Sequence, residues 1–201
     1  MMNEKQGKLF VFTAPSGSGK TTIVRHLLAK YPFLSFSVSA TTRGKRTHET
    51  EGNDYYFMSA EAFQHAIKES QFVEWEEVYT NQYYGTLKSE ITRILSSGNS
   101  VIFDIDVRGA MQIRKIYGDQ CMTVFVKLPD LSLLRERLTK RATESPESLA
   151  RRLNKAEVES TYENYFDFVL VNDKLDVAFM EAEHIIETFV FGPQGHWDGK
   201  E

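Results

Sequence analysis

The sequence lacks most of the features that would indicate a secreted, membrane-spanning or nucleic-acid-binding protein. Cys121 is the only cysteine, so no internal disulfide can form. No apolar stretch approaches the roughly 20 residues that span a bilayer, and no charged-then-apolar leader precedes the first strand-like run. The formal net charge of -4 excludes a global positive field for nucleic acid. We therefore expect a cytoplasmic protein that meets anionic ligands through local arginines.

The composition and the order of apolar segments predict a single α/β domain. Apolar residues make up 41% of the 201 positions and charged residues 26%, the usual mix of a globular domain with a sizeable core. Because parallel strands need crossover helices, alternating strands and helices predict a three-layer sandwich with a central parallel sheet. We expect strands at 9–13, 100–106, 122–128 and 168–171, and helices near 21–30, 107–117, 131–141, 146–165 and 174–187.

Two stretches depart from this alternation. Between about 36 and 97 the sequence carries alternating runs at 37–41, 55–57 and 72–79 with two helices, which we interpret as an inserted subdomain. Residues 139–145 crowd arginine, lysine and threonine before a helix start at Ser145 and Pro146, a pattern typical of a mobile flap. The predicted division is a core of 7–35, 98–136 and 153–190, an insertion of 36–97, a lid of 137–152 and a tail of 191–201.

A glycine-rich phosphate loop (P-loop) directly follows the first expected strand and runs into a helix. Glycines let the backbone wrap closely, successive N–H groups and the helix N-terminus meet phosphate oxygens, and Lys20 bridges the outer phosphates. Thr21 would hold Mg²⁺. Ala14 stands where this motif normally has its first glycine, which requires a backbone angle that alanine tolerates. The loop predicts ATP binding by Ala14, Pro15, Ser16, Gly17, Ser18, Gly19, Lys20, Thr21 and Thr22, but alone it fits kinases, GTPases, transporters and motor ATPases equally.

A second anion site is indicated within the inserted segment. Arg43 and Arg46 lie three apart on an extended or turning segment with tyrosine hydroxyls nearby, and together they can close around a phosphate monoester. Further on, Glu74 lies on an expected strand, and a Tyr-Tyr-Gly-Thr run beginning at Tyr83 offers more hydroxyls. Each piece alone is more typical of a solvated polar turn or a half-buried strand than of a ligand site.

The motifs of the chain are the P-loop, the Ser-x-Ser-x-Thr-Thr-Arg-x-x-Arg run from Ser37, the Asp-Tyr-x-Phe step, Glu-Trp, Tyr-Tyr-Gly-Thr and Asp-Ile-Asp. Taken together, these motifs resemble the guanylate kinase family from Leu9 to about Phe189. The resemblance implies Mg²⁺-dependent phosphoryl transfer from ATP to GMP, and to dGMP. It implies that Arg43, Arg46, Tyr55 and Tyr84 bind the GMP phosphate, and that Ser39, Glu74, Thr86 and Asp106 read guanine. It also implies that Lys20, Arg43 and the lid arginines Arg137, Arg141 and Arg152 are catalytic, and that Asn172 contacts adenine.

Asp104 and Asp106 end an apolar strand two positions apart, so both side chains leave the same face if the strand stays regular. Two carboxylates this close repel each other unless cations or donors separate their roles. By the resemblance we assign Asp104 to magnesium and Asp106 to guanine. The alternative from the residues alone is that they cap the following helix.

Two other functions are compatible with parts of this pattern. One is a kinase of the same architecture that acts on another phosphorylated acceptor, against which Glu74 and Ser39 argue. The other is a non-catalytic guanylate-kinase-like module that binds phosphorylated peptides. Such modules typically lack a working phosphate loop, whereas Gly17, Gly19 and Lys20 are present here.

Overall fold

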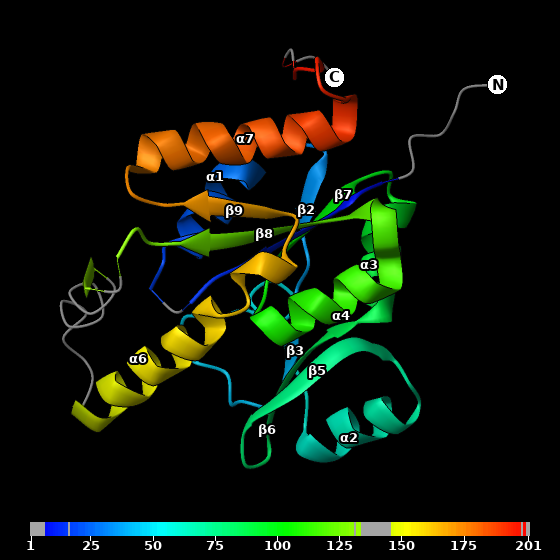
Figure 1. Ribbon diagram of the computed structural model, residues 1–201. Helices are drawn as coiled ribbons and strands as arrows, with labels where there is room; N and C mark the ends of the chain where they lie inside the picture. The colour runs from blue at the N-terminus through cyan, green and yellow to red at the C-terminus, as the bar shows by residue number, and fades with distance from the viewer. Residues whose placement is uncertain (1–6, 16, 131, 134–145, 198, 200–201) are drawn as a thin grey trace.

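The core of the protein is a five-stranded parallel sheet, as the sequence predicts (Figure 1). The computed structural model describes residues 7–15, 17–130, 132–133, 146–197 and 199, and for 146–149 the backbone only. The sheet order is β2-β7-β1-β8-β9, and every neighbouring pair is parallel. Its strands are β1 (Leu9–Thr13), β2 (Leu34–Phe36), β7 (Ser100–Asp104), β8 (Cys121–Lys127) and β9 (Phe168–Val171).

Helices cover both faces of this sheet, which confirms the three-layer architecture (Figure 1). In the central strand β1, Phe10 and Phe12 pack with α1 (Lys20–Lys30) and α7 (Leu175–Phe191). Leu9 and Val11 point to the opposite face and pack with α3 (Lys88–Ser96) and α4 (Val107–Tyr117). Because successive side chains of a strand alternate between faces, one fully buried strand supplies apolar residues to both layers.

The inserted segment forms its own four-stranded sheet of order β4-β3-β6-β5. Its strands are β3 (Ala40–Thr41), β4 (Tyr56–Phe57), β5 (Phe72–Tyr79) and β6 (Gln82–Leu87), with α2 (Ala60–Lys68) packed against them. The side chain of Ser59 caps α2 by accepting from the amide of Ala62. Phe63 of α2 stacks on Phe72 with ring centroids 4.3 Å apart. This small core holds the β5–β6 hairpin beside the main sheet.

Several element bounds differ from the sequence-based expectation. The strand expected over 100–106 ends at Asp104, and the helix expected over 146–165 is α6 (Pro146–Ser160) followed by a short 3-10 helix, η2 (Glu163–Tyr165). A similar turn, η1 (Gly118–Gln120), links α4 to β8. Strands β2 and β6 were not predicted. Apart from residues 132 and 133, which are helical, the helix expected over 131–141 lies outside the described residues, and so does Ser145.

Two other sequence-based inferences concern Cys121 and membrane spans. Cys121 is buried at the start of β8, where burial raises the pKa of its thiol to about 12, so it is a core side chain. Within the part of the chain that the structure describes, no helix has both the length and the apolar character needed to cross a membrane.

Candidate functional site

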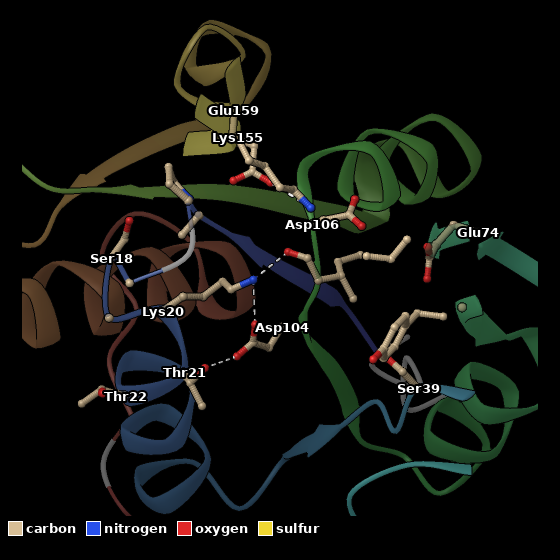
Figure 2. A pocket seen from close by; sticks show the side chains of 18 of the residues that line it. Ser18, Lys20, Thr21, Thr22, Ser39, Glu74, Asp104, Asp106, Lys155 and Glu159 are labelled. Carbon is tan, nitrogen blue, oxygen red and sulfur yellow. Dashed lines mark hydrogen bonds and ion pairs between the residues drawn. The ribbon is translucent and has the colours of Figure 1, made fainter. Parts of the chain in front are cut away.

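A cavity of about 410 Å³ opens where β1 and β7 end, at the edge of the parallel sheet where ligands bind in many α/β folds. Figure 2 shows Lys20 and Thr21 on one side of it and Ser39 and Glu74 on the other. The cavity therefore brings together most of the residues that the sequence assigns to two separate ligands. The predicted site residues that line it are Ala14, Pro15, Gly17, Ser18, Gly19, Lys20, Thr21, Thr22, Ser39, Tyr55, Glu74, Tyr84, Asp104 and Asp106.

The phosphate loop has the backbone conformation that its glycines predict. Gly17 and Gly19 have φ angles of 97° and 89°, in the left-handed region that favours glycine. Gly19 caps α1 without a side-chain acceptor, so the first N–H groups of the helix point toward the cavity end of the loop. Ala14 is buried in the core with Phe12, and its φ is not in the left-handed region. The backbone angle at this position is therefore one that alanine tolerates, although the motif normally has glycine there.

Three side chains connect the loop to β7. Lys20 Nζ lies 2.7 Å from Asp104 Oδ1 and donates to the carbonyl oxygen of Ile105 at 2.8 Å. Thr21 Oγ1 donates to Asp104 Oδ2 at 2.6 Å (Figure 2). The register of the sheet explains this contact, because Phe12 of β1 is the partner of Asp104 in β7. The parallel pairing thus fixes one carboxylate directly beside the phosphate loop.

The oxygen atoms of Thr21 and Asp104 are of the type that Mg²⁺ prefers, since magnesium binds hard oxygen ligands and usually retains waters and phosphate oxygens. Among the described residues, no group of three or more histidine, cysteine or acidic side chains is arranged to hold a metal. Thr21 and Asp104 could supply two oxygen ligands, and the remaining positions of an octahedral magnesium ion would be left to waters or ligand oxygens.

Arg43 is held in place by Glu49, a residue whose role the sequence reading missed. Arg43 donates through both terminal nitrogens to Glu49, at 3.0 and 2.7 Å, and the amide of Arg46 donates to the same carboxylate at 2.8 Å. Arg43 lowers the pKa of Glu49 to about 2, and Glu49 in turn raises the pKa of Arg43. The guanidinium carbon also lies 5.3 Å from the Tyr55 ring centroid. Glu49 lies six positions after Arg43 in a stretch with no regular helix or strand, so no periodicity in the sequence indicates the contact.

Tyr55 and Tyr84 lie together, with ring centroids 6.0 Å apart, and both line the cavity. Arg43 and Arg46 lie beyond the cavity lining, and the side chain of Arg46 is exposed. The insertion therefore places two tyrosines at the cavity and the two arginines on the loop next to them. Such a set of hydroxyl and guanidinium donors can surround a phosphate monoester.

Glu74 faces the cavity from β5. The register of the β5–β6 hairpin places Glu74 opposite Thr86, whose hydroxyl donates to Glu74 Oε1 at 2.5 Å. Thr86 is buried behind the carboxylate and does not line the cavity. Burial raises the pKa of Glu74 to about 7, although the Thr86 hydroxyl acts in the opposite direction. When ionised, a half-buried carboxylate in this position can accept from N–H groups of a ligand.

Asp106 is not on the strand, contrary to the expectation that it shares a strand face with Asp104. It is the N-cap of α4, and its Oδ1 accepts from the amide of Gly109 at 2.9 Å, so the capping alternative is correct. It nevertheless lines the cavity. Burial acts to raise the pKa of Asp106, but hydrogen bonds with Glu76 and Gly109 hold it below its usual range. Burial and Asp106 raise the pKa of Glu76 to about 7.

The remaining predicted residues lie outside the cavity lining or outside the described residues. Asn172 is buried, and its Nδ2 donates to the carbonyl oxygen of Ser18 at 2.7 Å, which anchors the phosphate loop to the end of β9. Arg152 lies on α6, three residues before Lys155. Ser16, Arg137 and Arg141 are outside the described residues.

Lys155 and Glu159 line the cavity but were not predicted. They lie one turn apart on α6, and Lys155 Nζ is 3.7 Å from Glu159 Oε1. Figure 2 shows the Lys155 side chain directed toward Asp106. Arg152, Lys155 and Glu159 follow the i, i+3, i+7 spacing of one helix face, a signal that could have found them.

The comparisons with known proteins agree with this geometry. A family model for guanylate kinase matches residues 6–189. Guanylate kinases from Bacteroides thetaiotaomicron and Porphyromonas gingivalis are 44% and 46% identical to the chain; the alignments cover 94% and 91% of it, and 93% and 98% of those proteins. The crystal structure of guanylate kinase from Anaplasma phagocytophilum matches the fold with a TM-score of 0.71 at 24% identity, covering 93% of this chain and 88% of that one. The chain therefore belongs to the guanylate kinase family.

Proposed function

We propose that the protein is an ATP:GMP phosphotransferase, which transfers the γ-phosphoryl group of ATP to GMP or dGMP and releases ADP together with GDP or dGDP, respectively. The observation that carries this proposal is one cavity with a lysine-bearing phosphate loop on one side and the half-buried carboxylate of Glu74 on the other (Figure 2). Membership of the guanylate kinase family supports the same reaction.

At the ATP side, the backbone N–H groups of the phosphate loop and the start of α1 would bind the phosphates. Lys20 would leave Asp104 and bridge the outer phosphate oxygens, where its charge offsets the negative charge that builds up during transfer. Thr21 and Asp104 would hold Mg²⁺, which supplies further charge neutralisation when bound with ATP. We extend the proposal to Arg152 as an additional phosphate contact and to Asn172 as an adenine contact; the matching roles of Arg137 and Arg141 stay predictions of the resemblance.

At the GMP side, Arg43, Arg46, Tyr55 and Tyr84 would surround the phosphate monoester. Guanine presents N1–H and a 2-amino group as donors, and an O6 acceptor. Glu74 and Asp106 would accept hydrogen bonds from these two donors, and the Ser39 hydroxyl would donate to O6. Thr86 would position Glu74 through its hydrogen bond to the carboxylate. Adenine has no N1–H or 2-amino group, so it would leave the two carboxylates without partners, and polar sites of this kind discriminate strongly.

The chemistry needs no protein nucleophile. In phosphoryl transfer the protein mainly positions the attacking and leaving oxygens in line and neutralises charge on the transferred group. The site residues on the two sides of the cavity would hold the two nucleotides with their phosphates facing each other. Bringing the insertion and the lid toward the core would exclude water and protect ATP from hydrolysis.

The proposal is tested by measuring ADP release with GMP, dGMP, AMP and dTMP as acceptors, with and without Mg²⁺. We expect turnover with GMP and dGMP only, and only with magnesium. Equal or faster turnover with AMP or dTMP would favour a kinase for another acceptor, and nucleotide-independent binding of a phosphorylated peptide would favour a binding module.

Replacement of Arg43 by alanine sharpens this test. The change removes the guanidinium held by Glu49, and removing one charge-stabilising donor typically lowers kcat/KM about 100-fold or more. Lys45→Ala, which removes an exposed charge from the same loop, is the matched control and should behave as the parent protein. Near-normal turnover of Arg43→Ala with GMP would contradict the assignment of the phosphate site.

A further inference from the structure

Gly109 occupies a position between the two carboxylates that the proposed function assigns to guanine. It lies in the first turn of α4, three residues after the N-cap Asp106, and its amide donates to Asp106 Oδ1. On its other side is the carboxylate of Glu74. A β-carbon placed on Gly109 would lie 2.8 Å from Glu74 Oε2 and 3.1 Å from Glu74 Cδ. The distance of 2.8 Å is shorter than real β-carbons show to neighbouring heavy atoms, so a glycine at 109 lets Glu74 lie against the helix without displacement.

The backbone of Gly109 itself does not require glycine. Its φ lies outside the left-handed region, since the described positive-φ glycines are Gly17, Gly19, Gly52, Gly98, Gly118, Gly192 and Gly199. In the first turn of a helix alanine is the better helix former. The backbone conformation therefore does not explain the absence of a side chain at 109. The short distance to the Glu74 side chain does explain it.

Gly85 is a comparison case in which the atoms close to the glycine belong to the paired strand and cannot easily move. A β-carbon at Gly85 would lie 2.8 Å from the carbonyl oxygen of Glu74 and 2.9 Å from Trp75 Cβ, both of which are fixed by the β5–β6 pairing. Alanine at 85 would push strands apart and lower stability. At Gly109 the nearest atoms are the tip of a flexible side chain. Alanine there would be accommodated by moving the Glu74 carboxylate, at little cost to the fold.

We propose that Gly109 is a positioning residue for guanine recognition, because its missing side chain sets the place of the Glu74 carboxylate relative to Asp106. The inference rests on the proposed function. Thr86 holds Oε1 of Glu74 from one side at 2.5 Å, and the surface of α4 at Gly109 limits Oε2 on the other. Two acceptors for two neighbouring donors of one flat base must keep a fixed spacing, so a displaced Glu74 weakens the recognition of guanine without touching the phosphate loop.

The test compares the parent protein with Gly109→Ala in steady-state kinetics. We expect KM for GMP to rise about tenfold while kcat and KM for ATP stay within about twofold. The preference for GMP over IMP, which lacks the 2-amino group, should fall, and the melting temperature should not. Gln112→Ala, at an exposed position on the same helix, is the control and should change none of these. An unchanged KM for GMP in folded Gly109→Ala would overturn the inference.

A double-mutant cycle with Glu74→Ala separates the two contacts of Gly109. If the alanine at 109 acts through Glu74, it should cause no further loss of kcat/KM for GMP once the Glu74 side chain is gone. An equal loss in both backgrounds would show that the effect passes through the Asp106 cap, and would overturn the inference. Should Gly109→Ala fail to fold, circular dichroism of the double variant decides, since removing Glu74 must restore folding.

The same experiments distinguish this inference from the proposed function. If the parent protein did not phosphorylate GMP, the proposed function would fail and the inference with it. If the parent protein phosphorylates GMP and Gly109→Ala does so with the same KM and the same preference over IMP, the inference alone fails.

Discussion

At the phosphate-loop side of the cavity one carboxylate, Asp104, lies against Lys20, whereas at the side proposed for guanine the carboxyl groups of Glu74, Glu76 and Asp106 lie close to one another. Two cations are near this second group, since Arg108 lies 3.8 Å from Glu76 and Lys155 is directed toward Asp106 (Figure 2). Asp104 contacts Lys20 at 2.7 Å and the Thr21 hydroxyl at 2.6 Å. Glu74 has the Thr86 hydroxyl as its partner, and the pKa values of Glu74 and Glu76 are raised to about 7 by burial. Under the proposed function, one side would exchange the Lys20–Asp104 ion pair for an anionic ligand, and the other would receive the N–H donors of guanine.

The residues of the two sides are carried by different parts of the fold. Lys20, Thr21 and Asp104 are attached to the ends of β1 and β7, which are buried between two helical layers. Glu74 and Glu76 are on β5 of a small separate sheet, and Asp106 is at the start of α4. The guanine side is therefore assembled from two parts of the molecule, and its carboxyl groups depend on contacts between them. We expect substitutions on the two sides to have separable effects.

The largest effect is expected for Lys20→Ala. Removing the ammonium group takes away the cation that bridges the outer phosphates and should lower kcat by about 100- to 1000-fold. Calorimetry should show an almost unchanged Kd for GMP, because Glu74 and Arg43 lie on the other side. Lys68→Ala, an exposed lysine on α2, is the control. A parallel loss of GMP affinity would show that the two sides are not independent.

The phosphate loop was predictable from the sequence because its chemistry is local. Strand, glycines, lysine and helix are contiguous, and the φ angles of Gly17 and Gly19 follow from residue type. The parallel sheet was predictable for a similar reason, since buried parallel strands are short continuous apolar runs such as β1. β2 and β6 were missed because a three-residue edge strand and a tyrosine-rich hairpin strand carry weak apolar signals.

The residues proposed to bind guanine were identified only through the family resemblance. The Glu74–Thr86 contact depends on hairpin register, and the Glu76–Asp106 contact joins a strand to a distant helix start. Asp106 was wrongly placed on the strand because its i+2 spacing from Asp104 gives no sign that the strand ends first. A helix cap and a strand residue are both compatible with Asp-x-Asp, and tertiary structure decides between them.

The next largest effect concerns pH and the affinity for GMP. Glu74 must be ionised to accept both from the Thr86 hydroxyl and from a guanine N–H, and its pKa in the protein is about 7. As pH falls from 8 to 6 the group gains a proton, so KM for GMP should rise about tenfold while KM for ATP changes less. Steady-state kinetics across this range measures both. This response would sharpen the contrast between the two sides, since Lys20 and Asp104 lie at the side proposed for ATP.

Glu74→Gln is the control for this pH effect. The GMP phosphate itself takes up a proton near pH 6, and that contribution is retained in the variant. We expect a higher KM for GMP with a flatter pH dependence in Glu74→Gln. An equal slope in the variant and the parent protein would mean that Glu74 is not the group that titrates.

The smallest effect is expected for Glu76→Gln, on stability rather than catalysis. The pKa of Glu76 is about 7 in the folded protein, above its ordinary value of 4.5, so its contribution to stability is full below 4.5 and is lost as pH rises through 7. A neutral glutamine can still donate to Asp106 and does not incur this loss. After allowance for its partial exposure, Glu76→Gln should be about 1 kcal/mol more stable at pH 8, with only a fraction of that gain at pH 5. Urea unfolding at both pH values measures the difference, and Glu157→Gln, at an exposed position of α6, should show none. An equal increase in the free energy of unfolding at both pH values would show that Glu76→Gln acts through packing and not through the ionisation of Glu76 beside Asp106.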